Sequence, residues 1–94
     1  MQIRWSPSAA EDLLRIVEYI RKENAPAAQR VAKTIHENVG SLSSFPYRGR
    51  QGRVENTREL PVPSLPFPVV YRVIQDAVEI AGLIHGAQRW PPQE

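Results

Sequence analysis

The hydrophobic residues of this chain change their spacing near its middle, from the period of a helix to that of a strand. In the first half they recur every three or four residues, as on one face of a helix, in two stretches, and the first helix is expected to end at residues 22–24, just before the second begins. The two stripes are Ala9, Leu13, Ile16, Val17 and Ile20, and then Ala28, Val31, Ala32, Ile35, Val39 and Leu42. So short a connection predicts an antiparallel helical hairpin.

The ends of this hairpin carry recognisable signals. Residues 2–5 alternate polar and apolar, which predicts a short first strand. Ser6 is expected to cap the first helix with Pro7 at its first position, where a missing N–H costs nothing. Pro26 is expected to begin the second helix, and Phe45-Pro46 to stop the chain from continuing it.

The second half predicts three strands, at about residues 57–62, 67–74 and 77–85. Residues 47–56 have two glycines, three arginines and no periodicity, so they are expected to form a loop. Gln75-Asp76 has the length of a tight hairpin turn. Pro61 and Pro63 cannot donate to a ladder, so the 57–62 strand should be short, bulged or at an edge.

These elements predict an α+β fold: an N-terminal strand, then an antiparallel helical hairpin packed on a small, mainly antiparallel β-sheet, in the order β-α-α-β-β-β. A chain of 94 residues can close one such core, so residues 1–94 are expected to form a single domain. Alternation along the last two strands predicts two faces. One would hold Val70, Ile74, Val78, Ile80 and Ile84, and the other Tyr71, Val73, Glu79 and Leu83.

Composition excludes several classes of protein. There is no cysteine, and His36 and His85 are far apart, so neither a metal site nor a cofactor is expected. No apolar run approaches the roughly 18 residues that span a bilayer, and the N-terminus turns polar too early for a signal peptide. We therefore expect a cytoplasmic protein with no membrane partner, in which His36 is structural.

Every basic residue after Pro46 is an arginine, whereas both lysines lie in the first half. These arginines are Arg48, Arg50, Arg53, Arg58, Arg72 and Arg89. The planar guanidinium binds phosphate or carboxylate through two hydrogen bonds at once, which points to an anionic partner. Plain surface solubility explains the same pattern, and the composition alone leaves both interpretations open.

Several ordered motifs resemble those of the RelE/ParE toxin superfamily. They are WSPSAAEDL, FPYRGRQGR, NTRELPVPSLPFPVVYRV and LIHGAQRWP, and the resemblance runs from about residue 3 to residue 91. It implies the toxin of a type II toxin–antitoxin system of the plasmid-stabilisation type, with a helical hairpin on a small sheet and a cognate antitoxin as partner. RelE-like members cleave messenger RNA on the ribosome, as mRNA interferases, whereas ParE-like members poison DNA gyrase.

The resemblance to RelE-like nucleases implies a set of catalytic residues. They are Arg58, Glu59, Arg72, His85, Gln88 and Arg89. His85 titrates near neutral pH and could move protons, the arginines could hold the phosphate, and Glu59 could act as a base if it were desolvated. Glu55 or Glu59, with Arg72 and His85, could imitate the glutamate, arginine and histidine of another nuclease branch. The chain departs from that pattern where Glu59 and Pro61 replace lysines and Pro68 replaces an arginine, and it lacks a tyrosine near its C-terminus.

Structural roles compete with these catalytic ones. His85 could only bond a neighbouring carbonyl, Arg72 could pair with Glu79 across the hairpin, and Arg58 could pair with Glu59 or Glu55.

A second group of residues is expected to bind RNA or a protein partner without taking part in a chemical step. It consists of Tyr47, Arg48, Arg50, Arg53 and Trp90. Gly49 and Gly52 should make the arginine loop pliable, and its charge would attract ribosomal RNA, DNA or an acidic antitoxin segment. Trp90 could stack on a base but is more readily a C-terminal anchor, and a core or hinge contact suits Tyr47 as well.

Three functions remain in competition at this point. The first is a metal-independent, ribosome-dependent endoribonuclease that inhibits growth by cleaving mRNA. The alternative is a gyrase inhibitor without catalytic residues, and the third is a toxin that has lost activity.

Overall fold

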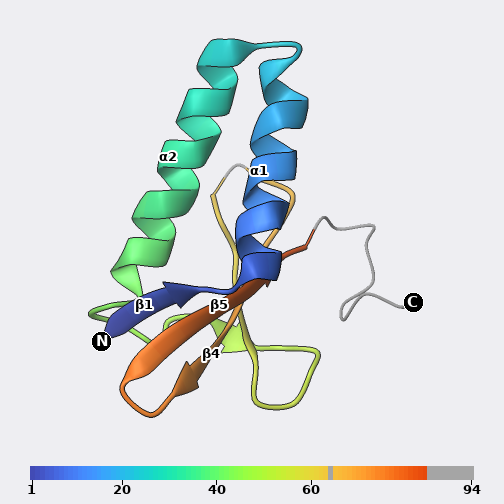
Figure 1. Ribbon diagram of the computed structural model, residues 1–94. Coiled ribbons are helices and arrows are strands. Elements are labelled where there is room, and N and C mark those ends of the chain that lie inside the picture. The colour runs from blue at the N-terminus through green and yellow to red at the C-terminus, as the bar shows by residue number, and fades with distance from the viewer. Residues whose placement is uncertain (64, 85–94) are drawn as a thin grey trace.

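The computed structural model describes residues 1–63 and 65–84 (Figure 1). The chain begins with strand β1 (Gln2–Trp5) and turns into helix α1 (Pro7–Arg21). As predicted, Ser6 caps α1 by accepting a hydrogen bond from the backbone N–H of Ala9 at 3.0 Å, and Pro7 occupies the first turn. The carboxylate of Asp12 accepts the N–H of Leu83 at 3.1 Å, which ties the start of the helix to the last strand.

Helix α2 (Ala25–Ser41) returns beside α1, so the predicted antiparallel hairpin is confirmed (Figure 1). It begins one residue before the predicted Pro26, because the Asn24 side chain accepts the Ala27 N–H at 3.0 Å and acts as the cap. The chain leaves α2 before Phe45-Pro46, as expected.

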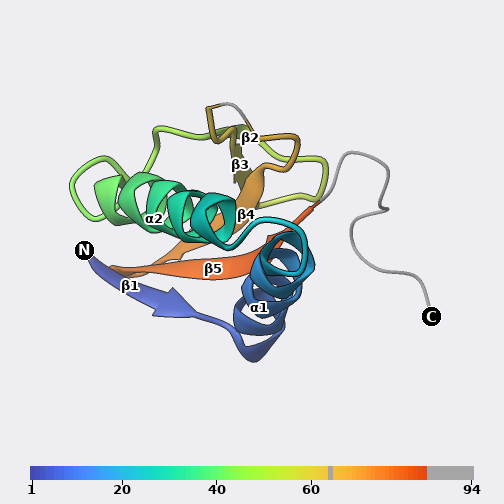
Figure 2. The same ribbon diagram turned by 90° about the horizontal axis from the view of Figure 1, so that it is seen from above.

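The sheet has five strands in the order β1-β5-β4-β3-β2, which Figure 2 shows from one edge to the other. Strands β3 (Arg58–Leu60), β4 (Val69–Ile74) and β5 (Ala77–Leu83) replace the three predicted ones with shorter bounds. Among the strands of residues 1–63 and 65–84, only β1 pairs in parallel, with β5. The predicted α+β class, a helical hairpin on a mainly antiparallel sheet, is therefore confirmed.

The prediction that residues 47–56 lack a strand was wrong, because Arg50–Gln51 form strand β2 and pair with β3. A two-residue strand has no hydrophobic period to detect. Strand β3 is short, as predicted. Because β2 pairs with it, β3 is not at the edge of the sheet.

The predicted division of side chains between the sheet faces was also wrong. Tyr71 stands opposite Ile80 and Val73 opposite Val78, so these four residues share one face. That face packs against the helices in a core formed with Ile35, Val39 and Leu42, among others. The register between β4 and β5 shifts between Val70 and Tyr71, whose partners are Gly82 and Ile80, so Ala81 is an extra residue. The shift brings Leu83 onto the same core face as Ile80, although strict alternation would separate them.

Candidate functional site

We call residues 46–56 the arginine-rich segment. The hydroxyl of Tyr71 anchors the start of this segment to the sheet. It donates a hydrogen bond to the carbonyl of Pro46 and accepts one from the N–H of Gly49, both at 2.8 Å. The side chain is fully buried. Burial raises the pKa of this phenol above its ordinary value, and the Gly49 hydrogen bond, Arg58 and Arg48 oppose that effect less strongly.

The carboxylate of Glu59 fastens the rest of the segment. One oxygen lies 3.4 Å from a terminal guanidinium nitrogen of Arg50, its partner in the register of β2 with β3. The other oxygen accepts the backbone N–H of Arg53 at 3.1 Å and lies 3.5 Å from its Nε. The residue is only 2% exposed. Glu59 therefore neutralises part of the arginine charge and orders the segment.

The glycines of this segment allow close packing, a role that the prediction of a pliable loop did not include. A side-chain carbon at Gly49 would lie 2.7 Å from the Tyr71 hydroxyl and 3.0 Å from the carbonyl oxygen of Glu59. At Gly52 it would collide with the Thr57 hydroxyl. The absence of a side chain is what lets β2 and the following turn lie against β3.

Arg58, from β3, binds the backbone of the same segment. One guanidinium nitrogen donates to the carbonyl of Gly49 at 2.7 Å and to that of Tyr47 at 3.3 Å. Its guanidinium carbon also lies 5.0 Å from the centre of the Tyr47 ring, a cation–π geometry. These contacts take the place of the surface pairing with Glu59 or Glu55 that the sequence allowed.

Arg72 points away from Arg58. Its Nε donates to Glu79 on the neighbouring strand at 2.9 Å, the cross-strand pair that was the structural alternative for this residue. Arg58 stands opposite Tyr71 in the register, so it shares that residue's face of the sheet, whereas Arg72 follows Tyr71 and lies on the other face. The structure thus does not gather these two arginines around one point.

The remaining predicted residues cannot be placed. His85, Gln88, Arg89 and Trp90 lie outside the described residues, and their proposed roles stay predictions. His36 is accounted for, since its ring packs 5.7 Å from that of Trp5, in keeping with a structural role.

A polar hollow of about 610 Å³ opens on the Arg58 face, next to Tyr47. Its walls come from the β2–β3 turn and from β4, and its lining residues are Tyr47, Gln51, Glu55, Asn56, Thr57, Arg58 and Val73. An apolar hollow of about 600 Å³ adjoins it through Tyr47 and is lined by residues 44–48. Phe45 and Tyr47 expose 66% and 62% of their surface there, a large amount for aromatic side chains.

We call Phe45, Tyr47, Arg48 and Arg58 the basic-aromatic surface. It lies in and beside the segment between α2 and β3, at the end of the molecule opposite the α1–α2 turn (Figure 1). Sequence reasoning missed Phe45, because its position before a proline marked it only as the end of a helix. Asn56, at a positive φ of 67°, lies in the turn that shapes the polar hollow, and asparagine is a residue type that favours this backbone conformation.

Two further properties concern the described part of the chain, residues 1–63 and 65–84. Within it, no helix is long and apolar enough to cross a membrane. Nor do three or more histidine and acidic side chains come together there in a way that could hold a metal ion.

Comparison with known proteins decides the family. Residues 3–90 match the family model described as the ParE toxin of the type II toxin–antitoxin system parDE. The chain belongs to the ParE toxin family. It is 40% identical over 90 residues to the putative toxin Y4kP of Sinorhizobium fredii, covering 96% of this chain and 93% of that protein. It is 32% identical over 87 residues to toxin RelE2 of Caulobacter vibrioides, covering 93% and 97% of the two chains.

The fold of this ParE family member also agrees with a solved relative. The chain superposes on a chain of the structure titled "Chromosomal ParDE TA system from P. aeruginosa" with a TM-score of 0.81 and 26% identity, over 90% of this chain and 95% of that one. Membership makes the protein the toxin of a ParDE-type toxin–antitoxin system, and it implies an antitoxin as partner.

Proposed function

We propose that this toxin stops growth by binding DNA gyrase, with no catalytic residue of its own. One observation carries the proposal: the candidate catalytic side chains that can be placed do not converge. Arg58 and Arg72 lie on opposite faces of the sheet, and both oxygens of Glu59 are held by Arg50 and Arg53. A site for RNA cleavage needs an available base and positive charge around one phosphate, so this arrangement favours a binding function.

The basic-aromatic surface has the composition that binding to a large partner requires. Exposed aromatic and arginine side chains are the residues that most often dominate the energy of protein–protein interfaces. Tyr71 and Glu59 hold the backbone behind this surface in place, which lowers the entropic cost of binding. The basic-aromatic surface is therefore preorganised for binding.

Ribosome-dependent mRNA cleavage is the second candidate, because one relative is named toxin RelE2. Under this function His85, Gln88 and Arg89 would supply the chemistry, with Arg58 or Arg72 contacting RNA. The antitoxin would then cover the same basic surface that meets RNA.

A paired experiment separates the two functions. The purified chain is added to gyrase and relaxed DNA, while induced cells are followed for mRNA ends on ribosomes and for the DNA-damage response. We expect loss of supercoiling, trapped DNA breaks and intact mRNA. Cleavage at A-site codons that disappears in His85→Ala and Arg89→Ala variants would instead establish the nuclease.

Matched arginine variants test the surface. Arg48→Ala removes a charge from the basic-aromatic surface, where the Arg48 guanidinium donates to the Ser41 hydroxyl at 2.7 Å. Arg30→Ala removes an exposed arginine from α2. We expect the first variant to weaken gyrase inhibition several-fold and the second to leave it unchanged.

A further inference from the structure

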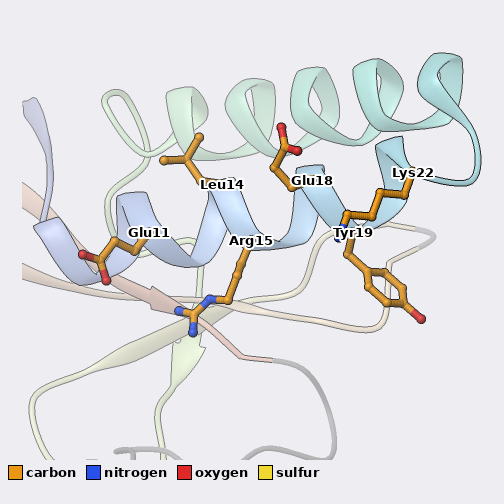
Figure 3. A pocket seen from close by; sticks show the side chains of 6 residues that line it. All are labelled: Glu11, Leu14, Arg15, Glu18, Tyr19 and Lys22. Atoms are coloured by element: carbon orange, nitrogen blue, oxygen red, sulfur yellow. The ribbon is translucent and has the colours of Figure 1, made fainter.

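The outer face of α1 carries a stripe of exposed side chains that the core does not use. They line a shallow hollow of about 600 Å³ and are Glu11, Leu14, Arg15, Glu18, Tyr19 and Lys22 (Figure 3). Leu14 and Tyr19 are 65% and 73% exposed, whereas Ala9, Leu13 and Ile16 of the same helix belong to the core. Two large apolar groups within a charged stripe indicate a contact surface.

The order of the residues in this stripe is self-complementary. Counted from a midpoint between Ile16 and Val17, Glu11 lies as far toward one end of the helix as Lys22 lies toward the other. Leu14 and Tyr19 are equidistant from the same midpoint, and so are Arg15 and Glu18. Each acid therefore mirrors a base, and each apolar residue mirrors an apolar one.

We propose that α1 pairs through this stripe with the α1 of a second copy, antiparallel and about a two-fold axis. Because the helical rise per residue is constant, an antiparallel copy sets mirrored residues at the same level: Glu11 with Lys22, Arg15 with Glu18, and Leu14 with Tyr19. A parallel copy would set acid against acid and base against base. The charges thus select the antiparallel arrangement, and Leu14 and Tyr19 supply the apolar area that it buries.

Existing contacts do not oppose the pairing. Arg15 bonds Asp12 at 2.7 Å and Glu18 bonds Arg21 at 2.8 Å, both within the helix and both with at least one well-exposed partner. Exposed ion pairs of this type contribute little and can be shared with a second acceptor. The stripe on α1 shares no residue with the basic-aromatic surface, so this proposal does not depend on the proposed function.

Charge reversal provides the test. Glu11→Lys alone gives the stripe two bases at its ends, and Lys22→Glu alone gives it two acids, so each variant should repel its own copies. Mixed together, the two single variants restore both oppositely charged pairs, as does the double variant with itself. Sedimentation velocity of the full chain across a range of concentrations measures the association. Lys33→Glu, on an exposed part of α2, is the control for net charge.

We expect the parent, the double variant and the Lys33→Glu control to form dimers, and each single variant to dimerise roughly tenfold or more weakly. An equal mixture of the single variants should form dimers as the parent does, which a folding defect could not produce. Leu14→Asp should abolish dimers while circular dichroism stays unchanged. A parent that sediments only as a monomer, or single variants that dimerise like the parent, or a mixture that does not recover, would overturn the proposal.

Discussion

Among single residues, Glu59 shows how a candidate base can also hold a segment of the fold in place. Its buried carboxylate holds Arg50 and Arg53, and with them the backbone of the arginine-rich segment. Replacing it by glutamine removes the charge but keeps the size, so we expect Glu59→Gln to lower the free energy of unfolding by about 1–3 kcal/mol. Urea denaturation measures this loss. Glu55→Gln, an exposed carboxylate in the same segment, is the control and should change little. Equal stabilities for the two variants would contradict the structural role of Glu59.

Tyr71 predicts how stability depends on pH. Burial raises the pKa of its phenol above the ordinary 10.0, so the folded chain keeps the proton at pH values where the unfolded chain releases it. This contribution is complete below about pH 10 and is lost as the pH rises through the folded pKa. We expect Tyr71→Phe to be less stable near neutral pH, because Pro46 and Gly49 lose their partner, but to show a shallower decline at alkaline pH.

Urea unfolding of both proteins at a series of alkaline pH values checks this prediction. Tyr47→Phe, at a position 62% exposed, should retain the profile of the parent. A Tyr71→Phe variant that declines as steeply as the parent would mean that other groups cause the alkaline loss.

For secondary-structure elements, two glycines offer opposite predictions from the same substitution. Gly49→Ala would force a methyl group against the buried Tyr71 ring and the Glu59 carbonyl, so we expect a loss of about 1–3 kcal/mol. Gly40→Ala places a methyl group in open space on α2, so we expect a gain of about 0.5–1 kcal/mol. Thermal and urea unfolding measure both. A Gly49→Ala variant as stable as the parent would show that the close approach of Gly49 does not govern the packing of β2.

The elements also show why part of the fold was predictable. The helical hairpin has two long apolar stripes and side-chain caps at Ser6 and Asn24, which are local signals. By contrast, β2 has too few residues to show a period, and the extra residue at Ala81 is defined only by the register of β5 against β4, so neither leaves a pattern in the sequence. The extra residue also accounts for part of the incorrect assignment of the sheet faces, because alternation cannot be followed across it.

For the molecule as a whole, the family could be predicted from motifs, but the geometry of the site could not. In the sequence, Arg58 and Arg72 both fall on predicted strands and both are candidate phosphate-binding residues. Which face each one takes depends on the register of β3 against β4, and that register is set by packing of the whole core. The same limit applied to Phe45, whose exposure depends on how the segment after α2 meets the sheet.

If the toxin binds its target through the basic-aromatic surface, a substitution there should reduce growth inhibition without changing the stability of the fold. Phe45 is 66% exposed, so Phe45→Ser should change the free energy of unfolding by under about 0.5 kcal/mol. An exposed aromatic anchor typically contributes about 2 kcal/mol or more to an interface, so the same variant should inhibit growth far less. Ile74→Ser, at a residue 43% exposed beside the β4–β5 turn, is the control and should remain toxic. Induced growth curves, read beside urea unfolding of both variants, measure the difference. A Phe45→Ser variant as toxic as the parent would place the target contact on another face of the molecule.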